Sequence, residues 1–344
     1  MDYGRLLSRS FEITRKYRAL WLFGILLAIF GGSGGGSGNF GNFGNFGGGG
    51  GSGRGGGNGT LPTIPGPVWE IVAIVIAALV CILIIWIILS IVLRFISRGA
   101  LIGLVQELEA AGTTPTVRRG FSIGRSRLWQ LLGIALTINI PLFIVLIAIL
   151  LVAALPALSA ILPLISAGRS PQQIGGVLVG SILGSVLLLC CAGIFLWIVA
   201  LVIRPFYEFF MRECVIQKRG VFDSIREGYR QVRANLGNVA ILYILIIGIS
   251  IGYAILMIPI VLVLVGIALG TGIAVGFAAG ATAGSFSPIV PAIIVGAIVA
   301  IPVLLVILFI SGLYQVFEST LWTEGYLAIT APKAPAVTES AAAT

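Results

Sequence analysis

The stretch from Val68 to Leu93 reads VWEIVAIVIAALVCILIIWIILSIVL, and Glu70 is its only charged residue. A helix of about 20 apolar residues is long enough to cross the roughly 30 Å hydrocarbon core of a bilayer. This run exceeds that length, so it predicts a membrane-spanning helix.

Other runs of the same kind lie on both sides of it. The long ones cover 128–155, 174–203, 236–263 and 289–313. A shorter run, Ala19–Phe30, crosses only part of the core unless its helix continues into Gly31–Gly36. We therefore expect an all-α integral membrane protein with six spans. Five remain an alternative if the first run does not cross, and seven if Pro259 divides 236–285.

Composition agrees with this prediction. The 344-residue chain is 58% hydrophobic and 10% charged, with a mean hydropathy of +1.12. Soluble domains carry about 25% charged residues, which they need to cover a surface in water. The net charge of +9 would suggest nucleic acid as a partner of a soluble protein. Here the positions of the charges indicate a membrane and no nucleic acid.

The basic residues gather in alternate connecting segments. All of the 21 Lys and Arg except Arg54 and Arg169 lie in 1–18, 94–127, 204–235 and the C-terminal tail. Cytoplasmic segments of membrane proteins carry such an excess of Lys and Arg. The pattern predicts a multi-pass protein of the cytoplasmic membrane with both termini in the cytoplasm.

A short motif recurs before three of the runs. Its copies are Phe11-Glu-Ile-Thr-Arg15, Phe121-Ser-Ile-Gly-Arg125 and Tyr229-Arg-Gln-Val-Arg233, an aromatic residue followed four positions later by Arg. The recurrence predicts one membrane domain, 1–330, built from three parallel two-span repeats. They cover 1–98, with a disordered glycine-rich outer loop at 31–67, then 112–217 and 220–330. Residues 331–344 are expected to be a disordered tail.

Each motif copy also predicts a basic amphipathic helix at the cytoplasmic interface, because apolar and charged residues fall on opposite faces. The second such helix is expected to begin at Thr114-Pro115, a cap with proline in the first turn. Basic interfacial helices attract anionic phospholipids by roughly 1 kcal/mol per residue. The six motif residues are therefore candidate contacts for anionic lipid or for a membrane-protein partner. The alternative is that the charges only set topology.

The residues that most catalysts need are missing. The chain has no histidine, no glycine-rich phosphate loop ending in Lys-Ser/Thr, and no acidic residue in the middle of a span. We therefore expect a protein that is not an enzyme, with no catalytic residues, no metal site and no cofactor.

Two features inside the runs allow other hypotheses. Asn139 and Pro141 could line an irregular, solvated position, which would suit a small-solute transporter or channel, or they could form an interhelical hydrogen bond beside a kink. Glycines also recur every fourth residue, at Gly176, Gly180 and Gly184 and again at Gly272, Gly276, Gly280 and Gly284. Such spacing predicts helix-packing faces, either within the chain or between protomers of a homo-oligomer.

The first motif running into Leu20-Trp21-Leu22-Phe23-Gly24, the glycine-rich stretch, and the sequences Arg118-Arg119-Gly120-Phe121 and Arg226-Glu227-Gly228-Tyr229 together carry a resemblance. The chain resembles a broad group of prokaryotic multi-pass proteins of unknown function. That group is similar to the membrane domain fused to some glycerophosphoryl diester phosphodiesterases. The resemblance implies a six-helix bundle with no known activity of its own, because the phosphodiesterase barrel is absent. We expect a non-catalytic role, in membrane organisation or as an accessory subunit of a membrane complex.

Overall fold

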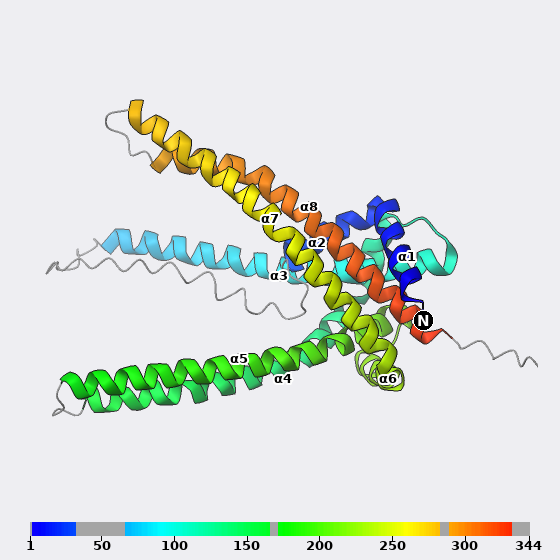
Figure 1. Cartoon of the computed structure of the whole chain (residues 1–344), viewed down its shortest axis with the longest axis horizontal. Helices are drawn as coiled ribbons and strands as arrows, with labels where there is room; N and C mark the ends of the chain where they lie inside the picture. The colour runs from blue at the N-terminus through cyan, green and yellow to red at the C-terminus, as the bar shows by residue number, and fades with distance from the viewer. Residues whose placement is uncertain (1, 32–65, 166–170, 283–288, 332–344) are drawn as a thin grey trace, which may run out of the picture. The chain divides into compact units, whose positions relative to one another are not determined.

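The computed structural model describes residues 2–31, 66–165, 171–282 and 289–331, and gives the backbone alone for 66–72, 156–165, 171–178, 182, 279–282 and 289–293. All regular secondary structure in these residues is α-helical (Figure 1). The helices are α1 (Tyr3–Lys16), α2 (Arg18–Gly31), α3 (Gly66–Ala111), α4 (Val117–Ile165), α5 (Pro171–Ile216), α6 (Val221–Ala234), α7 (Leu236–Thr282) and α8 (Ile289–Thr330). The predicted loop at 31–67 and tail at 331–344 lie almost wholly outside the described residues.

Five helices of the described chain, α3, α4, α5, α7 and α8, are long and apolar enough to cross a membrane. The chain is therefore a polytopic membrane protein. These helices have 42 to 49 residues, which corresponds to about 60–75 Å, roughly twice the thickness of the hydrocarbon core. The helix α2 has only 14 residues. A sixth crossing remains a prediction. Pro259 does not divide α7, which is continuous through it, so the proline-divided seventh span is not seen.

The described residues form two compact units. One holds those of 1–128 and 235–344, and the other holds those of 129–234. In the first unit, α2 packs against α3 and α8, and α7 runs beside α8 (Figure 1). Its core gathers apolar side chains from four helices, including Ile13 of α1, Phe23 of α2, Leu104 of α3 and Val316 of α8.

The contact between α2 and α8 is backbone to backbone. A Cβ atom added to Gly24 would overlap the carbonyl of Gly312, and one added to Gly312 would lie 2.8 Å from Ile25. Only glycine allows helices to approach this closely. Trp21 of α2 adds an edge-to-face contact with Phe309 of α8.

The long helices α3, α5 and α8 each have an exposed apolar part and a packed end. Almost every described side chain of 73–91, 179–202 and 294–309 is exposed or half-exposed, although these segments are strongly apolar. Most side chains of 95–105, 207–215 and 320–326 are buried. The packed ends also hold the acidic residues, such as Glu107 and Glu324. Lipid therefore suits the first part of each helix, and the packed end extends beyond it.

Local hydrogen bonds define the start of α4 and the end of α3. The helix α4 begins at Val117, and Thr116 Oγ1 accepts a hydrogen bond from the backbone N–H of Arg119 at 3.4 Å. The prediction of a cap at Thr114-Pro115 was therefore wrong by two residues, because a threonine hydroxyl nearer the helix caps it. The end of α3 is closed by Gly112 (φ +62°), whose N–H donates to the Leu108 carbonyl at 2.9 Å.

In the second unit, α6 packs against the end of α5. The ring of Tyr229 stacks on Phe206 with centroids 5.9 Å apart, and Phe210 lies against the backbone of Gly228. The Arg212 guanidinium is buried and donates to the Glu208 carboxylate one turn earlier at 2.7 Å.

Candidate functional site

The three copies of the sequence motif lie on α1, on the first turns of α4 and on α6. Their aromatic side chains are exposed: 62% for Phe11, 41% for Phe121 and 50% for Tyr229. The arginines four residues later, Arg15, Arg125 and Arg233, are exposed as well. Residues four apart lie on the same side of a helix. Each copy therefore presents an aromatic ring and a guanidinium together on its surface.

The residue before each aromatic is small and buried. Ser10, Gly120 and Gly228 occupy this position, and the residues four later, Thr14, Gly124 and Val232, are buried too. This buried edge holds each helix against another one. The helix α1 packs on α8, Gly124 of α4 lies against the Ile96 carbonyl of α3, and α6 packs on α5. The exposed aromatic and arginine therefore have a rigid support directly beneath them.

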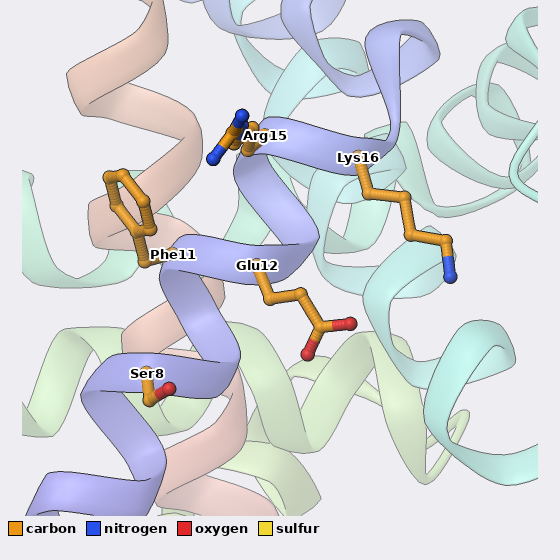
Figure 2. A pocket seen from close by; sticks show the side chains of 5 residues that line it. All are labelled: Ser8, Phe11, Glu12, Arg15 and Lys16. Carbon is orange, nitrogen blue, oxygen red and sulfur yellow. The ribbon is translucent and has the colours of Figure 1, made fainter.

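On α1 the exposed side lines a shallow hollow formed by Ser8, Phe11, Glu12, Arg15 and Lys16 (Figure 2). Phe11 and Arg15 project from one side of the helix, and Glu12 and Lys16 project from the other. An apolar ring and two cations at the edge of this hollow would suit a negatively charged group with an apolar body.

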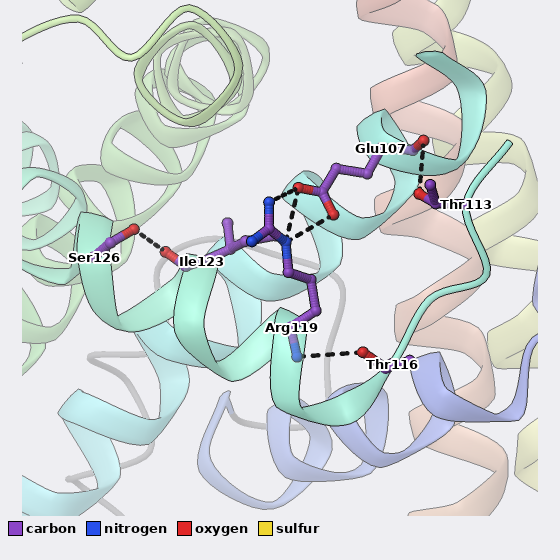
Figure 3. A network of polar contacts seen from close by, with 6 residues as sticks. All are labelled: Glu107, Thr113, Thr116, Arg119, Ile123 and Ser126. Carbon is purple, nitrogen blue, oxygen red and sulfur yellow. Dashed lines mark hydrogen bonds and ion pairs between the residues drawn. The ribbon is translucent and has the colours of Figure 1, made fainter. Parts of the chain in front are cut away.

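On α4 the base of the motif is held by an ion pair across α3 and α4 (Figure 3). The Arg119 guanidinium donates to both oxygens of the Glu107 carboxylate, from Nε at 3.1 and 3.2 Å and from Nη2 at 2.7 Å. Thr113 Oγ1 donates to the Glu107 carbonyl at 3.3 Å. Bidentate pairs of this kind orient both partners. Arg119 is thereby engaged with Glu107.

On α6 the corresponding contacts involve Glu213 and Glu227. Gln231 Nε2 donates to Glu213 at 3.1 Å, and Arg219 lies 3.4 Å from Glu213 and 3.5 Å from Glu227. Arg230 pairs with Glu227 at 2.6 Å. These carboxylates serve to attach and orient the helix.

The residues predicted within the bilayer lie elsewhere. Asn139 Nδ2 donates to the carbonyl of Ala135 on its own helix at 2.7 Å, and Pro141 is exposed. This bond within one helix gives the amide nitrogen a partner without a second helix.

Of the predicted packing glycines, Gly180 and Gly184 have no neighbouring atom within 4 Å of an added Cβ among the described residues. Gly276 is buried, as is Gly272, whose Cα lies 3.8 Å from the Cβ position of Gly296 in α8. The surroundings of Gly176 and Gly280 lie outside the described side chains.

A reciprocal polar contact between α7 and α8 was not predicted. Ser250 Oγ and the Tyr314 hydroxyl share a hydrogen bond at 2.6 Å, and the Tyr253 hydroxyl and Ser311 Oγ share one at 3.1 Å. The two tyrosine rings stack with centroids 4.0 Å apart. Both helices carry the spacing Ser-x-x-Tyr, at 250–253 and 311–314. It could not be recognised because the pairing of the two helices was unknown.

No group of three or more His, Cys, Asp or Glu side chains gathers as a metal would require within the described residues. No curated protein and no solved structure matches the chain. A family described as a family of unknown function, DUF7544, matches residues 8–320, from α1 into the packed end of α8. The chain therefore belongs to that family.

Proposed function

We propose that the chain is a non-catalytic membrane protein whose motif helices bind anionic phospholipid headgroups at the cytoplasmic face. Through these contacts it would organise the surrounding membrane or hold an accessory position in a membrane complex. The expected six spans, the three repeats and the cytoplasmic location of both termini belong to this proposal.

One observation carries it: three separate helices expose an aromatic ring and an arginine four residues apart, above a buried small residue. Setting topology requires positive charge, but it does not require an exposed aromatic at a fixed position beside the charge. An aromatic ring at the headgroup level and a guanidinium near a phosphate are the pair that an anionic lipid would use.

The repeats are supported by the shared pattern of burial. In each copy the residue before the aromatic and the residue before the arginine are buried, and each helix packs on the packed end of a long helix. The helix that precedes α4 is α3, and the one that precedes α6 is α5. The helix α1 has no predecessor and packs on α8, the last helix.

The first test compares two double variants of equal charge. Arg125→Gln with Arg233→Gln removes two motif arginines, whereas Arg54→Gln with Arg169→Gln removes two arginines from predicted outer segments. Each cation near a headgroup contributes about 1 kcal/mol. Binding of a fluorescent phosphatidylglycerol to the full-length chain in neutral detergent should therefore weaken roughly thirtyfold in the first variant only.

Equal losses in both double variants would mean that net charge alone attracts the lipid, and the proposal would be wrong. A solute flux in liposomes that disappears on Asn139→Leu, with lipid binding unchanged, would instead favour a transporter.

A further inference from the structure

Arg9 of α1 pairs with two carboxylates, and a third, buried carboxyl lies on α8, the helix on which α1 packs. Arg9 Nε and Nη2 lie 3.0 and 2.9 Å from Glu109 Oε1 of α3, and Arg9 Nη1 lies 3.3 Å from Glu12. Glu324 of α8 is 8% exposed, and its Oε1 is buried and accepts no hydrogen bond from the residues that the structure describes.

Glu324 follows the apolar part of α8 and belongs to its packed end. The apolar run of α8 ends at Leu313, and Glu324 follows about three helical turns later in the packed end. The charge of Arg9 acts on it electrostatically. Arg9 belongs to α1, whose exposed side carries Arg15 and Lys16. A helix with such a charged surface lies at the interface or in water.

The electrostatic surroundings of Glu324 favour its neutral form. The pKa of the Glu324 carboxyl is raised from an ordinary value of 4.5 to about 7, chiefly by burial and also by the nearby Glu109 carboxylate, while Arg9 opposes both. Among the other helices packed on α8, α7 contains no Asp, Glu, Lys, Arg or His, and α2 contains only Arg18 at its first residue. The nearest acid on α8 itself is Glu318, almost two turns earlier.

We propose that the Glu324 carboxyl is a proton-controlled latch that holds α1 against α8. While it is protonated, it lies buried beside Arg9 and Glu109 and the helix stays docked. When its proton leaves to solvent, three carboxylates share one guanidinium, and α1 separates from α8. That separation would move Phe11 and Arg15 relative to the membrane, a consequence that rests on the proposed lipid contact. The latch itself does not.

The direction of the pH dependence follows from linkage. An acid with a raised pKa in the docked state stabilises docking fully below its ordinary value, and this stabilisation is lost as the pH rises through the raised value. The equilibrium for release should therefore increase by up to about tenfold per pH unit between roughly pH 4.5 and 7, and level off above pH 7.

The test measures access to the buried edge of α1. In the full-length chain with its four native cysteines replaced by alanine, Ser10→Cys places a thiol at a fully buried position and Ser8→Cys places one on the exposed side of the same helix. The rate of modification at residue 10, divided by that at residue 8 at the same pH, removes the intrinsic pH dependence of thiol chemistry. Nanodiscs of phosphatidylcholine alone exclude any contribution from anionic lipid.

We expect this ratio to rise from pH 5 to pH 7 and then remain constant, and to stay low at every pH in Glu324→Gln. Glu109→Gln, which removes the neighbouring charge and leaves Arg9 to pair with Glu324, should flatten the rise. Glu107→Gln, an acid of α3 that pairs with Arg119, should leave it unchanged. A ratio independent of pH in the native chain, or a rise that persists in Glu324→Gln, would overturn the latch without affecting the lipid proposal.

Discussion

At the scale of single residues, two positions of the described ranges hold the backbone in the left-handed region. Gly112 follows α3 with φ +62°, and Lys218 lies just beyond α5 with φ +57°. Glycine adopts this conformation without cost, whereas a side chain with a Cβ is destabilised by roughly 1–2 kcal/mol. A glycine therefore adopts this φ without strain after α3, whereas a lysine adopts it at a cost after α5.

Lys218→Gly should raise the stability of the protein by about 1 kcal/mol, and Gly112→Ala should lower it by a similar amount. The measurement is the thermal unfolding midpoint of the purified chain in detergent, followed by tryptophan fluorescence. Lys218→Ala controls for the lost charge, because alanine removes the ammonium group but keeps the Cβ. A gain with Lys218→Ala as large as that with glycine would show that charge, and not the backbone, was responsible.

At the scale of helices, α2 depends on close contact more than on length. With 14 residues it is the shortest apolar helix of the described chain, yet it packs on both α3 and α8. Gly24 and Gly312 allow the backbones of α2 and α8 to touch. Because lipid tails are as apolar as leucine, tight packing and not burial from water must hold such a helix in place.

Gly24→Ala should therefore lower the unfolding midpoint, since an added methyl group meets a backbone carbonyl that cannot rotate away, at a cost of about 1–3 kcal/mol. Gly252→Ala is the matched control, because nothing lies within 4 Å of a Cβ at that position of α7. The control should be neutral or slightly stabilising, as alanine favours a helix over glycine. Equal midpoints for the two variants would contradict the packing argument.

At the scale of the whole molecule, topology depends on whether α2 crosses the bilayer. The basic residues of 94–127 and 204–235 require the same side for both segments if the positive-inside pattern holds. If α2 crosses, the N-terminus lies on that side too and the outer segment 31–67 lies opposite. Without that crossing, α1 and the motif on α4 would lie on opposite sides. Yet the close contacts of α1 and α2 with α3 and α8 lie within one compact unit, which supports the crossing.

Ser122→Cys and Glu227→Cys should each be protected from a membrane-impermeant thiol reagent in intact cells and react after permeabilisation. Ser37→Cys, in the predicted outer loop, should react in intact cells. Labelling at 122 or 227 from outside would remove the three-repeat scheme and the lipid proposal with it.

Much of this architecture could be predicted because it depends on the solvent. A run such as Val68–Leu93 predicts a lipid-covered helix whatever its neighbours are, and α3 contains it. The motif residues Phe11, Phe121 and Tyr229 could be found because their spacing is local and repeated. The helix ends were predicted less well: α4 begins at Val117 and is capped by Thr116 rather than Thr114, because the Thr116 hydroxyl accepts from the backbone N–H of Arg119.

Hydropathy alone was enough to predict a helical, multi-pass membrane protein, because water and lipid act on each segment of the chain separately. The pairing of the helices, by contrast, follows only from their packing in the folded protein. It brought Gly24 to Gly312, Ser250 to Tyr314, and Glu324 to the pair of Arg9 and Glu109. Such contacts join residues far apart in the chain, and their energies depend on distances of a few ångströms that no local pattern encodes.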